Sequence, residues 1–253
     1  MLRTMLTDPV WDKLSALMQH TGLVYHKAEH RLILEGILYR MRTGIPWRDL
    51  PLEFGRWNTV FVRFNAGSKK GVLNLIFKGL SGLADREWLF IDGSIVRAHQ
   101  HRAGAATNEE EAIGKSRGGR STKLHLAVDS QGLPVHFELS GGQTHDIKQA
   151  ESLVNNSPAS DFVIADKGYD SDAFRNIVEQ TGATPVIPYR KNSRKSEKPI
   201  DKGLYRYRHL VENAFARIKH FRAIATRYDK LERNYASMLA LAFTLVWLPM
   251  WAD

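Results

Sequence analysis

Apolar residues recur at helical spacing over the first third of the chain, and this pattern changes near residue 85. At the start, Thr7-Asp8-Pro9 predicts a capped helix with proline in its first turn. A second helix is expected to end at Thr43-Gly44 and to bury one face formed by Leu32, Ile33, Ile37, Leu38 and Met41. A short helix should follow the turn at Phe54-Gly55. Residues 1–84 are therefore predicted to form a small all-helical domain.

Small helices joined by a glycine-bearing turn are compatible with a helix-turn-helix module, which binds DNA. In that interpretation, the side chains that face DNA are Arg56, Asn58, Thr59 and Arg63. The alternative is that these helices form only a structural cap on the domain that follows.

From residue 87 onward, short apolar runs and period-two alternation predict strands. A buried strand at residues 88–91 ends at Asp92, and another at 162–165 ends at Asp166. The other expected elements are a hairpin of strands 123–129 and 134–139, a helix at 145–155, a helix at 171–182, a strand at 185–188, and long helices at 204–223 and 231–247. This order predicts a mixed sheet flanked by helices, as in ribonuclease-H-like domains, so residues 85–253 are predicted to form an α/β domain of that class.

The charge of the chain indicates the kind of partner it binds. Lys and Arg number 36 against 27 acidic residues, so the net charge is +9, which favours polyanions such as nucleic acid. The absence of cysteine excludes disulfides and thiolate zinc sites. The start of the chain lacks a signal-peptide core, and the apolar stretch 238–251 is shorter than the roughly 20 residues of a membrane span. We therefore expect no membrane association and a buried C-terminal helix.

Two aspartates, Asp92 and Asp166, each directly follow a predicted apolar strand. Ligands of open α/β sheets bind beyond the strand ends, and carboxylate oxygens are the ligands that Mg²⁺ prefers. A pair of such ions about 4 Å apart can hold the attacking and leaving oxygens of a phosphoryl transfer. A lone aspartate after a strand is more often a turn former or helix cap, so the interpretation depends on a third acid.

The third acid, Glu212, lies in a predicted helix with Tyr205, Arg208 and Lys219. At about 100° per residue these four side chains fall within one stripe roughly 60° wide. One acid, two cations and a phenol suit a metal-bound phosphodiester, with Glu212 on the metal and Arg208 and Lys219 on phosphates. Tyr205 is suited to bond a phosphate or to stack on a base. The alternative is a solvated helix face with salt bridges.

The spacing of Tyr205, Arg208, Glu212 and Lys219 resembles the Y-x-x-R-x-x-x-E-x-x-x-x-x-x-K signature of bacterial insertion-sequence DDE transposases of the superfamily called four/five. The segments at 90–94 and 165–171 resemble the first and second aspartate motifs of that family. Three further segments, at 38–51, 116–119 and 142–146, are similar to its IS-five branch. The resemblance runs from about residue 6 to residue 235, and the three acidic motifs occur in the family's order.

The resemblance implies a ribonuclease-H-like fold and a transposase that cleaves DNA at the ends of an insertion sequence. The freed 3′-OH then attacks target DNA at the same centre. It also implies two Mg²⁺ ions, replaceable by Mn²⁺, held by Asp92, Asp166 and Glu212. The expected partner is double-stranded DNA, both the terminal inverted repeats and the target. The expected assembly is a homodimer or larger on that DNA, in the bacterial cytoplasm on the nucleoid.

Two basic segments are candidate DNA contacts. The loop 189–198 precedes the glutamate helix and contains Arg190, Lys191, Arg194 and Lys195. A second segment follows the first aspartate and contains Lys115, Arg117, Arg120 and Lys123. Contact with the DNA backbone would make binding strongly salt-dependent. The alternative for both segments is a flexible solvated loop.

Other candidate ligands do not form a recognisable pattern. The scattered histidines His99, His101, His125, His136 and His145 lack metal-ligand spacing, and hard cations prefer oxygen. Asp129 is a spare acid, and Asp146 and Asp170 are expected to cap helices. Two alternatives to a transposase stay open: a nuclease of the same fold that does not join strands, and a domesticated DNA-binding protein without catalysis.

Overall fold

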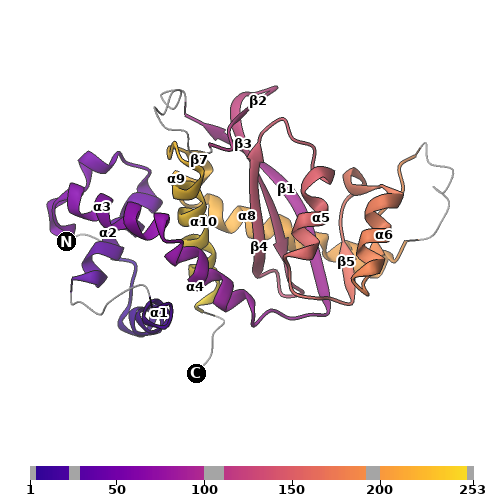
Figure 1. The fold of residues 1–253 in the computed structure, drawn as a ribbon, viewed down its shortest axis with the longest axis horizontal. Helices are drawn as coiled ribbons and strands as arrows, with labels where there is room; N and C mark the ends of the chain where they lie inside the picture. The colour runs from indigo at the N-terminus through magenta and orange to yellow at the C-terminus, as the bar shows by residue number, and fades with distance from the viewer. Residues whose placement is uncertain (1–3, 23–28, 100–110, 192–199, 250–253) are drawn as a thin grey trace. The chain divides into compact units, whose positions relative to one another are not determined.

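The computed structural model describes residues 4–22, 29–99, 111–191 and 200–249 (Figure 1). The chain divides into two compact units, each made of segments that are distant in sequence. The helical unit comprises residues 1–79, 97–112 and 218–253, and the sheet unit comprises residues 80–96 and 113–217. A domain boundary between residues 84 and 85 stays a prediction.

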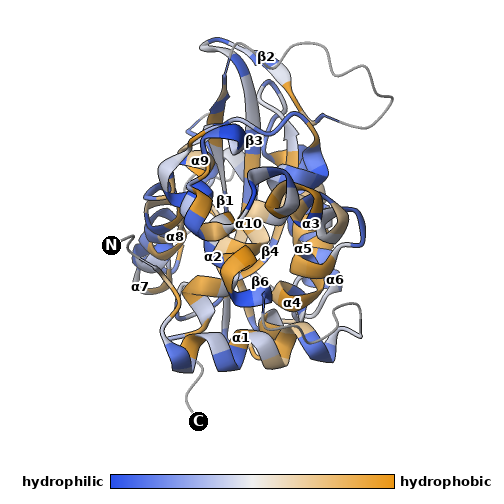
Figure 2. Ribbon diagram, turned by 90° about the vertical axis from the view of Figure 1, so that its left-hand side faces the viewer, coloured by the Kyte–Doolittle hydropathy of each residue, from blue (hydrophilic) through white to orange (hydrophobic). Residues whose placement is uncertain are grey.

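The first part of the helical unit is formed by helices, as the sequence pattern predicts. They are α1 (Asp8–His20), α2 (His30–Thr43), α3 (Trp57–Lys69) and α4 (Val72–Ser81), with 3₁₀ turns η1 (Trp47–Asp49) and η2 (Leu52–Phe54). Hydrophobic and hydrophilic residues alternate along α1, which buries Leu14 (Figure 2).

The buried face of α2 differs from the predicted one, because Leu32 is exposed and Ile33 is only partly buried. Leu32 is 46% exposed, whereas Leu34 is buried together with Ile37, Leu38 and Met41. These four residues follow the i, i+3, i+4, i+7 spacing of a single helical stripe, which leaves Leu32 outside it. The helix ends at Gly44, which has a left-handed φ of 72°.

The C-terminal segment belongs to the same helical unit. It contains α9 (Arg222–Ala225), the two-residue strand β7 (Thr226–Arg227) and α10 (Glu232–Trp247). Phe243 of α10 packs on Phe77 of α4 with ring centroids 5.3 Å apart. The prediction of a buried C-terminal helix is confirmed, and no helix in the described ranges has the length and apolar character needed to cross a membrane.

A mixed sheet forms the centre of the sheet unit. Its strands are β1 (Trp88–Ala98), β2 (Gly114–Ser116), β3 (Gly119–Val128), β4 (Pro134–Gly141), β5 (Phe162–Ile164) and β6 (Thr184–Val186). The main order is β4-β3-β1-β5-β6, and β2 also pairs with β3. Strands β1, β5 and β6 run parallel, whereas β3 and β4 form the predicted antiparallel hairpin. This is the ribonuclease-H-like order, so the predicted α/β fold class is confirmed.

Helices α5 (Ile147–Asn155) and α6 (Asp172–Gln180) pack against each other in the sheet unit. Helix α5 also packs on the β3–β4 hairpin, and α6 packs on β6. Most of α8 (His209–Lys219) belongs to this unit, where it buries Val211, Ala214 and Phe215.

Two predicted boundaries are wrong. Strand β1 does not stop at Ile91 but continues through Asp92 to Ala98, where its last two residues pair with β7 in the helical unit. A strand can include polar residues when neighbouring backbone satisfies its hydrogen bonds, so hydrophobicity alone marked the wrong end.

The expected continuous helix over residues 204–223 is broken into α7 (Lys202–Tyr205), a 3₁₀ turn η5 (Arg206–Arg208), α8 and α9. At the break, Tyr207 stacks on Trp88 with ring centroids 5.3 Å apart, and His209 Nδ1 lies 2.9 Å from the carbonyl oxygen of Arg206. These contacts favour the tighter turn over a uniform α-helix.

Candidate active site

The parallel pairing of β1 with β5 brings Asp92 and Asp166 to one region of the sheet. Phe90 pairs with Ile164, and each aspartate lies two residues further along its own chain. Both carboxylates also accept a nearby backbone N–H: Gly93 N lies 2.7 Å from Asp92 Oδ1, and Gly168 N lies 2.6 Å from Asp166 Oδ1. The backbone therefore fixes both acids before any ligand binds.

Arg208 connects Asp92 with Glu212. Its Nη1 donates to Asp92 Oδ2 at 3.0 Å, and its Nη2 donates to Glu212 Oε1. The Arg208 side chain is 23% exposed, that of Asp92 is 21% exposed and that of Glu212 is 52% exposed. Although η5 breaks the predicted helix, Arg208 and Glu212 are four residues apart and still meet, as i and i+4 side chains do.

The charge around Asp92 is only partly balanced. Burial raises the pKa of Asp92, and the carboxylates of Asp166 and Asp146 raise it further, whereas the Gly93 N–H and the Arg208 guanidinium lower it. The net effect is a raised pKa, because burial removes the water that would stabilise the charged form. Arg208 carries one positive charge and contacts two carboxylates, so a cation placed beside Asp92 would meet more negative charge than Arg208 neutralises.

The buried hydroxyl of Tyr169 faces this negative region. Tyr169 is 1% exposed, and its hydroxyl has no hydrogen-bond partner among the described residues. Burial raises the pKa of Tyr169 well above its usual value, and Asp146, Asp92 and Asp166 raise it further. Tyr169 has no sequence signal of its own beyond its place three residues after Asp166 in the second aspartate motif.

Asp146 does not act as the predicted helix cap. It occupies the N-cap position of α5, yet its side chain makes no capping hydrogen bond. Instead, Lys123 Nζ lies 2.7 Å from Asp146 Oδ2, and His125 Nδ1 lies 3.5 Å from Asp146 Oδ1. Burial alone would raise the pKa of Asp146, but His125 and Lys123 lower it below its ordinary value. The ion pair of Asp146 with Lys123 forms because β3 passes close to the start of α5.

Asp170 is also not a cap, because Ser171 takes the N-cap position of α6. The Asp170 carboxylate instead accepts from Arg175 Nη2 at 2.9 Å and from the backbone N–H of Arg190 at 2.7 Å. The side chain of Arg190 donates to the carbonyl oxygens of Lys167 and Gly168. Arg190 is therefore tied to the turn that follows Asp166, and its contact with DNA stays a prediction.

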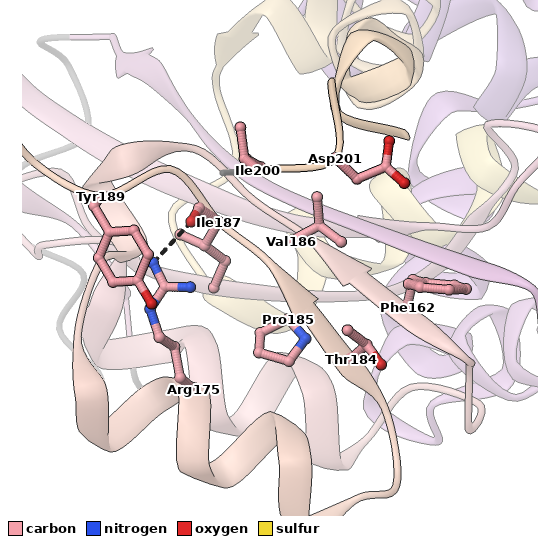
Figure 3. A pocket seen from close by; sticks show the side chains of 9 residues that line it. All are labelled: Phe162, Arg175, Thr184, Pro185, Val186, Ile187, Tyr189, Ile200 and Asp201. Carbon is pink, nitrogen blue, oxygen red and sulfur yellow. Dashed lines mark hydrogen bonds between the residues drawn. The ribbon is translucent and has the colours of Figure 1, made fainter. Parts of the chain in front are cut away.

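A cavity of about 340 Å³ lies at the edge strand β6, and Arg175 is one of the residues that line it (Figure 3). Its lining includes Phe162, Pro185 and Tyr189. The Arg175 guanidinium lies 4.0 Å from the centre of the Tyr189 ring and donates to the carbonyl oxygen of Ile187 at 2.8 Å. Asp92, Asp166 and Glu212 do not line this cavity.

The predicted DNA contacts lie in separate places. Arg117 and Arg120 are exposed at the β2–β3 hairpin, and Lys191 is exposed after β6. Tyr205, which ends α7, is half-buried, and Lys219 is exposed at the end of α8. Arg56 and Arg63 are exposed on the helical unit, as are Asn58 and Thr59. Arg194 and Lys195 lie outside the described residues, as does His101.

Within the described ranges, no group of three or more His, Asp or Glu side chains is close enough to hold a metal ion. The positive charge between Asp92 and Glu212 is that of Arg208. The acids nonetheless offer only oxygen donors, which suit a hard divalent cation, and Asp92 and Glu212 share the single positive charge of Arg208. The donor set therefore fits Mg²⁺ in its chemistry.

Comparison with known proteins identifies similar sequences. A family model described as "Transposase DDE domain" matches residues 84–247, and one described as "Putative transposase of IS4/5 family" matches residues 6–77. A Brucella ovis protein named "Putative transposase for insertion sequence element IS6501" is 36% identical over 129 residues, which cover 51% of this chain and 98% of that protein. A Burkholderia cepacia protein named for element IS402 is 29% identical over 136 residues, covering 49% of this chain and 62% of that protein.

Among solved structures, the chain is similar to one titled as a piggyBac transposase synaptic complex with hairpin DNA. The TM-score is 0.43 at 13% identity, and the match covers 70% of this chain and 44% of the piggyBac chain.

Proposed function

Because this chain belongs to the transposase DDE-domain family, we propose that it is a DNA transposase whose catalytic carboxylates are Asp92, Asp166 and Glu212. The substrates are the ends of an insertion sequence and the target DNA into which it is joined. The observation that carries the residue assignment is the Arg208 bridge, in which one guanidinium contacts the carboxylates of both Asp92 and Glu212. Asp166 is near enough to raise the pKa of Asp92.

The three carboxylates would hold a divalent cation, with Mg²⁺ as the expected ion and Mn²⁺ as a substitute. When bound, it supplies electrostatic stabilisation of the charge that develops on the transferring phosphoryl group. The backbone N–H groups of Gly93 and Gly168 orient Asp92 and Asp166 for this task. Arg208 is placed to pass from its carboxylate partners to a phosphate oxygen, since its planar guanidinium pairs equally well with either group.

Basic side chains around the acids would bind the DNA backbone. Tyr205, Arg190 and Lys191 belong to the sheet unit with the carboxylates, as do Arg117 and Arg120. On the helical unit, Arg56 and Arg63 are exposed on α3 and just before it, which supports a second DNA-binding surface there. Because transposition joins two ends, we infer that the protein acts as a dimer or larger assembly on DNA.

The decisive experiment is cleavage of DNA carrying the element's own ends, with Mg²⁺ in the buffer. Wild type is compared with Asp92→Asn, Asp166→Asn and Glu212→Gln, which keep side-chain size and remove charge. We expect each variant to lose cleavage by a factor of 10² or more while still binding DNA, in line with removal of a key electrostatic group. Normal cleavage by any one variant would remove that acid from the assignment.

A second assay separates transposition from the alternatives. A DNA end with a preformed 3′-OH is offered together with a target plasmid, and joined product is measured. Joining supports the transposase. Cleavage without joining would identify a nuclease, and binding without cleavage under either Mg²⁺ or Mn²⁺ would identify a DNA-binding protein that has lost catalysis.

A further inference from the structure

The turn that follows Asp166 carries the N–H group that orients its carboxylate. Gly168 N lies 2.6 Å from Asp166 Oδ1, and Gly168 is the middle residue of the 3₁₀ turn η4 (Lys167–Tyr169). A 3₁₀ turn has poorer hydrogen-bond geometry than an α-helix, so its conformation depends on contacts with neighbouring elements. The orientation of the Asp166 carboxylate therefore depends on the groups that hold η4 in place.

The residue that ends this turn, Asp170, is bound at both of its carboxylate oxygens. Its Oδ1 accepts a hydrogen bond from Arg175 Nη2 at 2.9 Å, and its Oδ2 accepts one from the backbone N–H of Arg190 at 2.7 Å. Burial alone would raise the pKa of Asp170, but the Arg190 N–H and the Arg175 guanidinium lower it below its ordinary value. The turn is thus fastened at its end to α6 and to the chain that follows β6.

The Arg175 side chain joins these segments to one another. Its Nη2 also donates to the carbonyl oxygen of Ile187 at 2.8 Å, and its guanidinium lies 4.0 Å from the centre of the Tyr189 ring (Figure 3). Arg175 is only 8% exposed, so these contacts are shielded from water. One buried guanidinium therefore holds the end of η4 against the chain that leaves β6.

Stability alone does not explain why this position carries an arginine. Removing a guanidinium from water costs free energy that a buried ion pair only offsets. The Nε atom of Arg175 is buried and has no hydrogen-bond partner among the described residues, which adds to that cost. Buried charges that are kept despite such a cost can serve to fix a single geometry. The geometry fixed here is that of the turn next to Asp166.

We propose that Arg175 is a positioning residue for Asp166: by holding Asp170 and the Ile187 carbonyl together, it fixes the turn whose Gly168 N–H orients the Asp166 carboxylate. The inference rests on the proposed function, because it takes Asp166 as a catalytic carboxylate. Arg175 acts through the turn and not on the substrate. Lysine would keep the positive charge at this position but would lack the planar guanidinium that stacks on Tyr189 and reaches both oxygen acceptors.

The test combines three measurements on the full chain: amide hydrogen–deuterium exchange, DNA affinity by fluorescence anisotropy, and the single-turnover rate of cleavage at saturating DNA. The variant is Arg175→Lys, and Arg40→Lys is its matched control. Arg40 is also a buried arginine bonded to an aspartate, with its Nη1 3.1 Å from Asp229 Oδ2, but it belongs to the helical unit. Thermal unfolding shows whether each variant is folded.

We expect Arg175→Lys to speed exchange of the Gly168 amide about tenfold, the ratio that corresponds to the loss of roughly one hydrogen bond. Exchange in the β3–β4 hairpin should stay as in wild type. The cleavage rate should fall about tenfold or more while DNA affinity changes less than about twofold, because a small displacement of a catalytic group slows the reaction at full occupancy. Arg40→Lys should leave both the Gly168 exchange and the cleavage rate unchanged.

Three results would overturn the inference. The first is a folded Arg175→Lys with wild-type exchange at Gly168 and a wild-type cleavage rate. The second is exchange that rises uniformly over the sheet unit, since Arg175 would then contribute only to stability. The third is a loss of DNA affinity large enough to account for all of the lost cleavage. If Arg175→Lys does not fold, Asp170→Asn replaces it and the same results are expected, because the asparagine amide turns an N–H toward one of the two donors.

Asp166→Asn in the same cleavage assay separates this inference from the proposed function. If wild type cuts no DNA, or if Asp166→Asn cuts as wild type does, the proposed function or its assignment of Asp166 fails and takes the inference with it. If Asp166→Asn is inactive while Arg175→Lys keeps the wild-type rate, only the inference fails.

Discussion

Two buried tyrosines, Tyr169 in the sheet unit and Tyr235 in the helical unit, differ in whether their hydroxyl group is paired. The Tyr169 hydroxyl is buried and has no partner in the part of the chain that the structure describes, whereas the buried hydroxyl of Tyr235 donates to the carbonyl oxygen of Ile224 at 2.9 Å. An unpaired buried hydroxyl costs free energy, and a paired one contributes about 1 kcal/mol. The two tyrosines therefore form a natural pair for comparison.

For Tyr169→Phe we expect a free energy of unfolding equal to that of wild type or higher by up to about 1 kcal/mol, because no hydrogen bond is lost. Tyr235→Phe should lower it by about 1 to 2 kcal/mol. Urea unfolding monitored by circular dichroism measures both. We also expect Tyr169→Phe to slow DNA cleavage, since the hydroxyl faces the carboxylates. Equal destabilisation of the two variants would contradict this account.

Glu138 provides a test of pH dependence. Burial alone would raise the pKa of Glu138, but hydrogen bonds from His136 and Ser152 lower it below its ordinary value. A carboxylate with a lowered pKa stabilises the fold above its unfolded pKa of about 4.3 and loses this effect as the pH falls through its folded pKa. Wild type should thus exceed Glu138→Gln in stability near neutral pH, and the gap should shrink at about pH 3. A gap that is constant between the two pH values would contradict the assignment.

At the scale of elements, the sequence pattern identifies most helices and strands but not where they end. The hairpin β3–β4, the strand β5 and the helices α5, α6 and α10 follow from hydrophobic period and turn residues. The extension of β1 and the break at η5 do not, because both depend on partners distant in sequence: β7 for the first and Trp88 for the second.

The end of α2 gives a prediction at this scale. Gly44 has a φ of 72°, and a Cβ there would lie 3.1 Å from Arg222 Cβ. Gly44→Ala should lower the free energy of unfolding by about 1 to 2 kcal/mol, because a left-handed backbone is costly for alanine.

Gly67→Ala in the interior of α3 is the matched control for Gly44→Ala. A Cβ at Gly67 meets no atom within 4 Å, so this change should stabilise the helix by up to about 1 kcal/mol. Thermal unfolding of the two variants under one set of conditions compares them. Destabilisation by both to the same degree would show that the left-handed conformation is not the cause.

At the scale of the whole molecule, the net charge of +9 is the property most directly linked to DNA. We expect the logarithm of the DNA-binding constant to fall linearly with the logarithm of salt concentration, since bound cations are released from DNA. Replacing Arg117 and Arg120 together by Gln should reduce that slope by about 2 if both contact phosphates.

Arg86→Gln is the control for charge alone, because Arg86 is exposed just before β1, about six residues from Asp92 along the strand. Fluorescence anisotropy of labelled DNA over a series of salt concentrations gives all three slopes. A slope that changes equally per charge in Arg86→Gln and in the double variant would mean that overall charge, rather than the hairpin, determines binding.

The candidate site was accessible to sequence reasoning only in part. Asp92, Asp166, Glu212 and Arg208 stand out because each lies in a local pattern: a carboxylate after an apolar run, or side chains at helical spacing. Asp146, Lys123, His125 and Tyr169 have no such pattern, and Asp146 even has the sequence context of a helix cap.

The sequence by itself determines the polycationic character of the chain, the order of its strands and helices, and the acids near the sheet. These follow from composition and short-range periodicity, which need no knowledge of distant contacts. Only the tertiary structure decides that Arg208 bridges Asp92 and Glu212, and that Asp146 turns from α5 toward Lys123 and Gly93. The reason is that each of these charged side chains could bind either a group nearby in sequence or one on a distant element. Which of the two it binds depends on the strands that the fold places within a few ångströms.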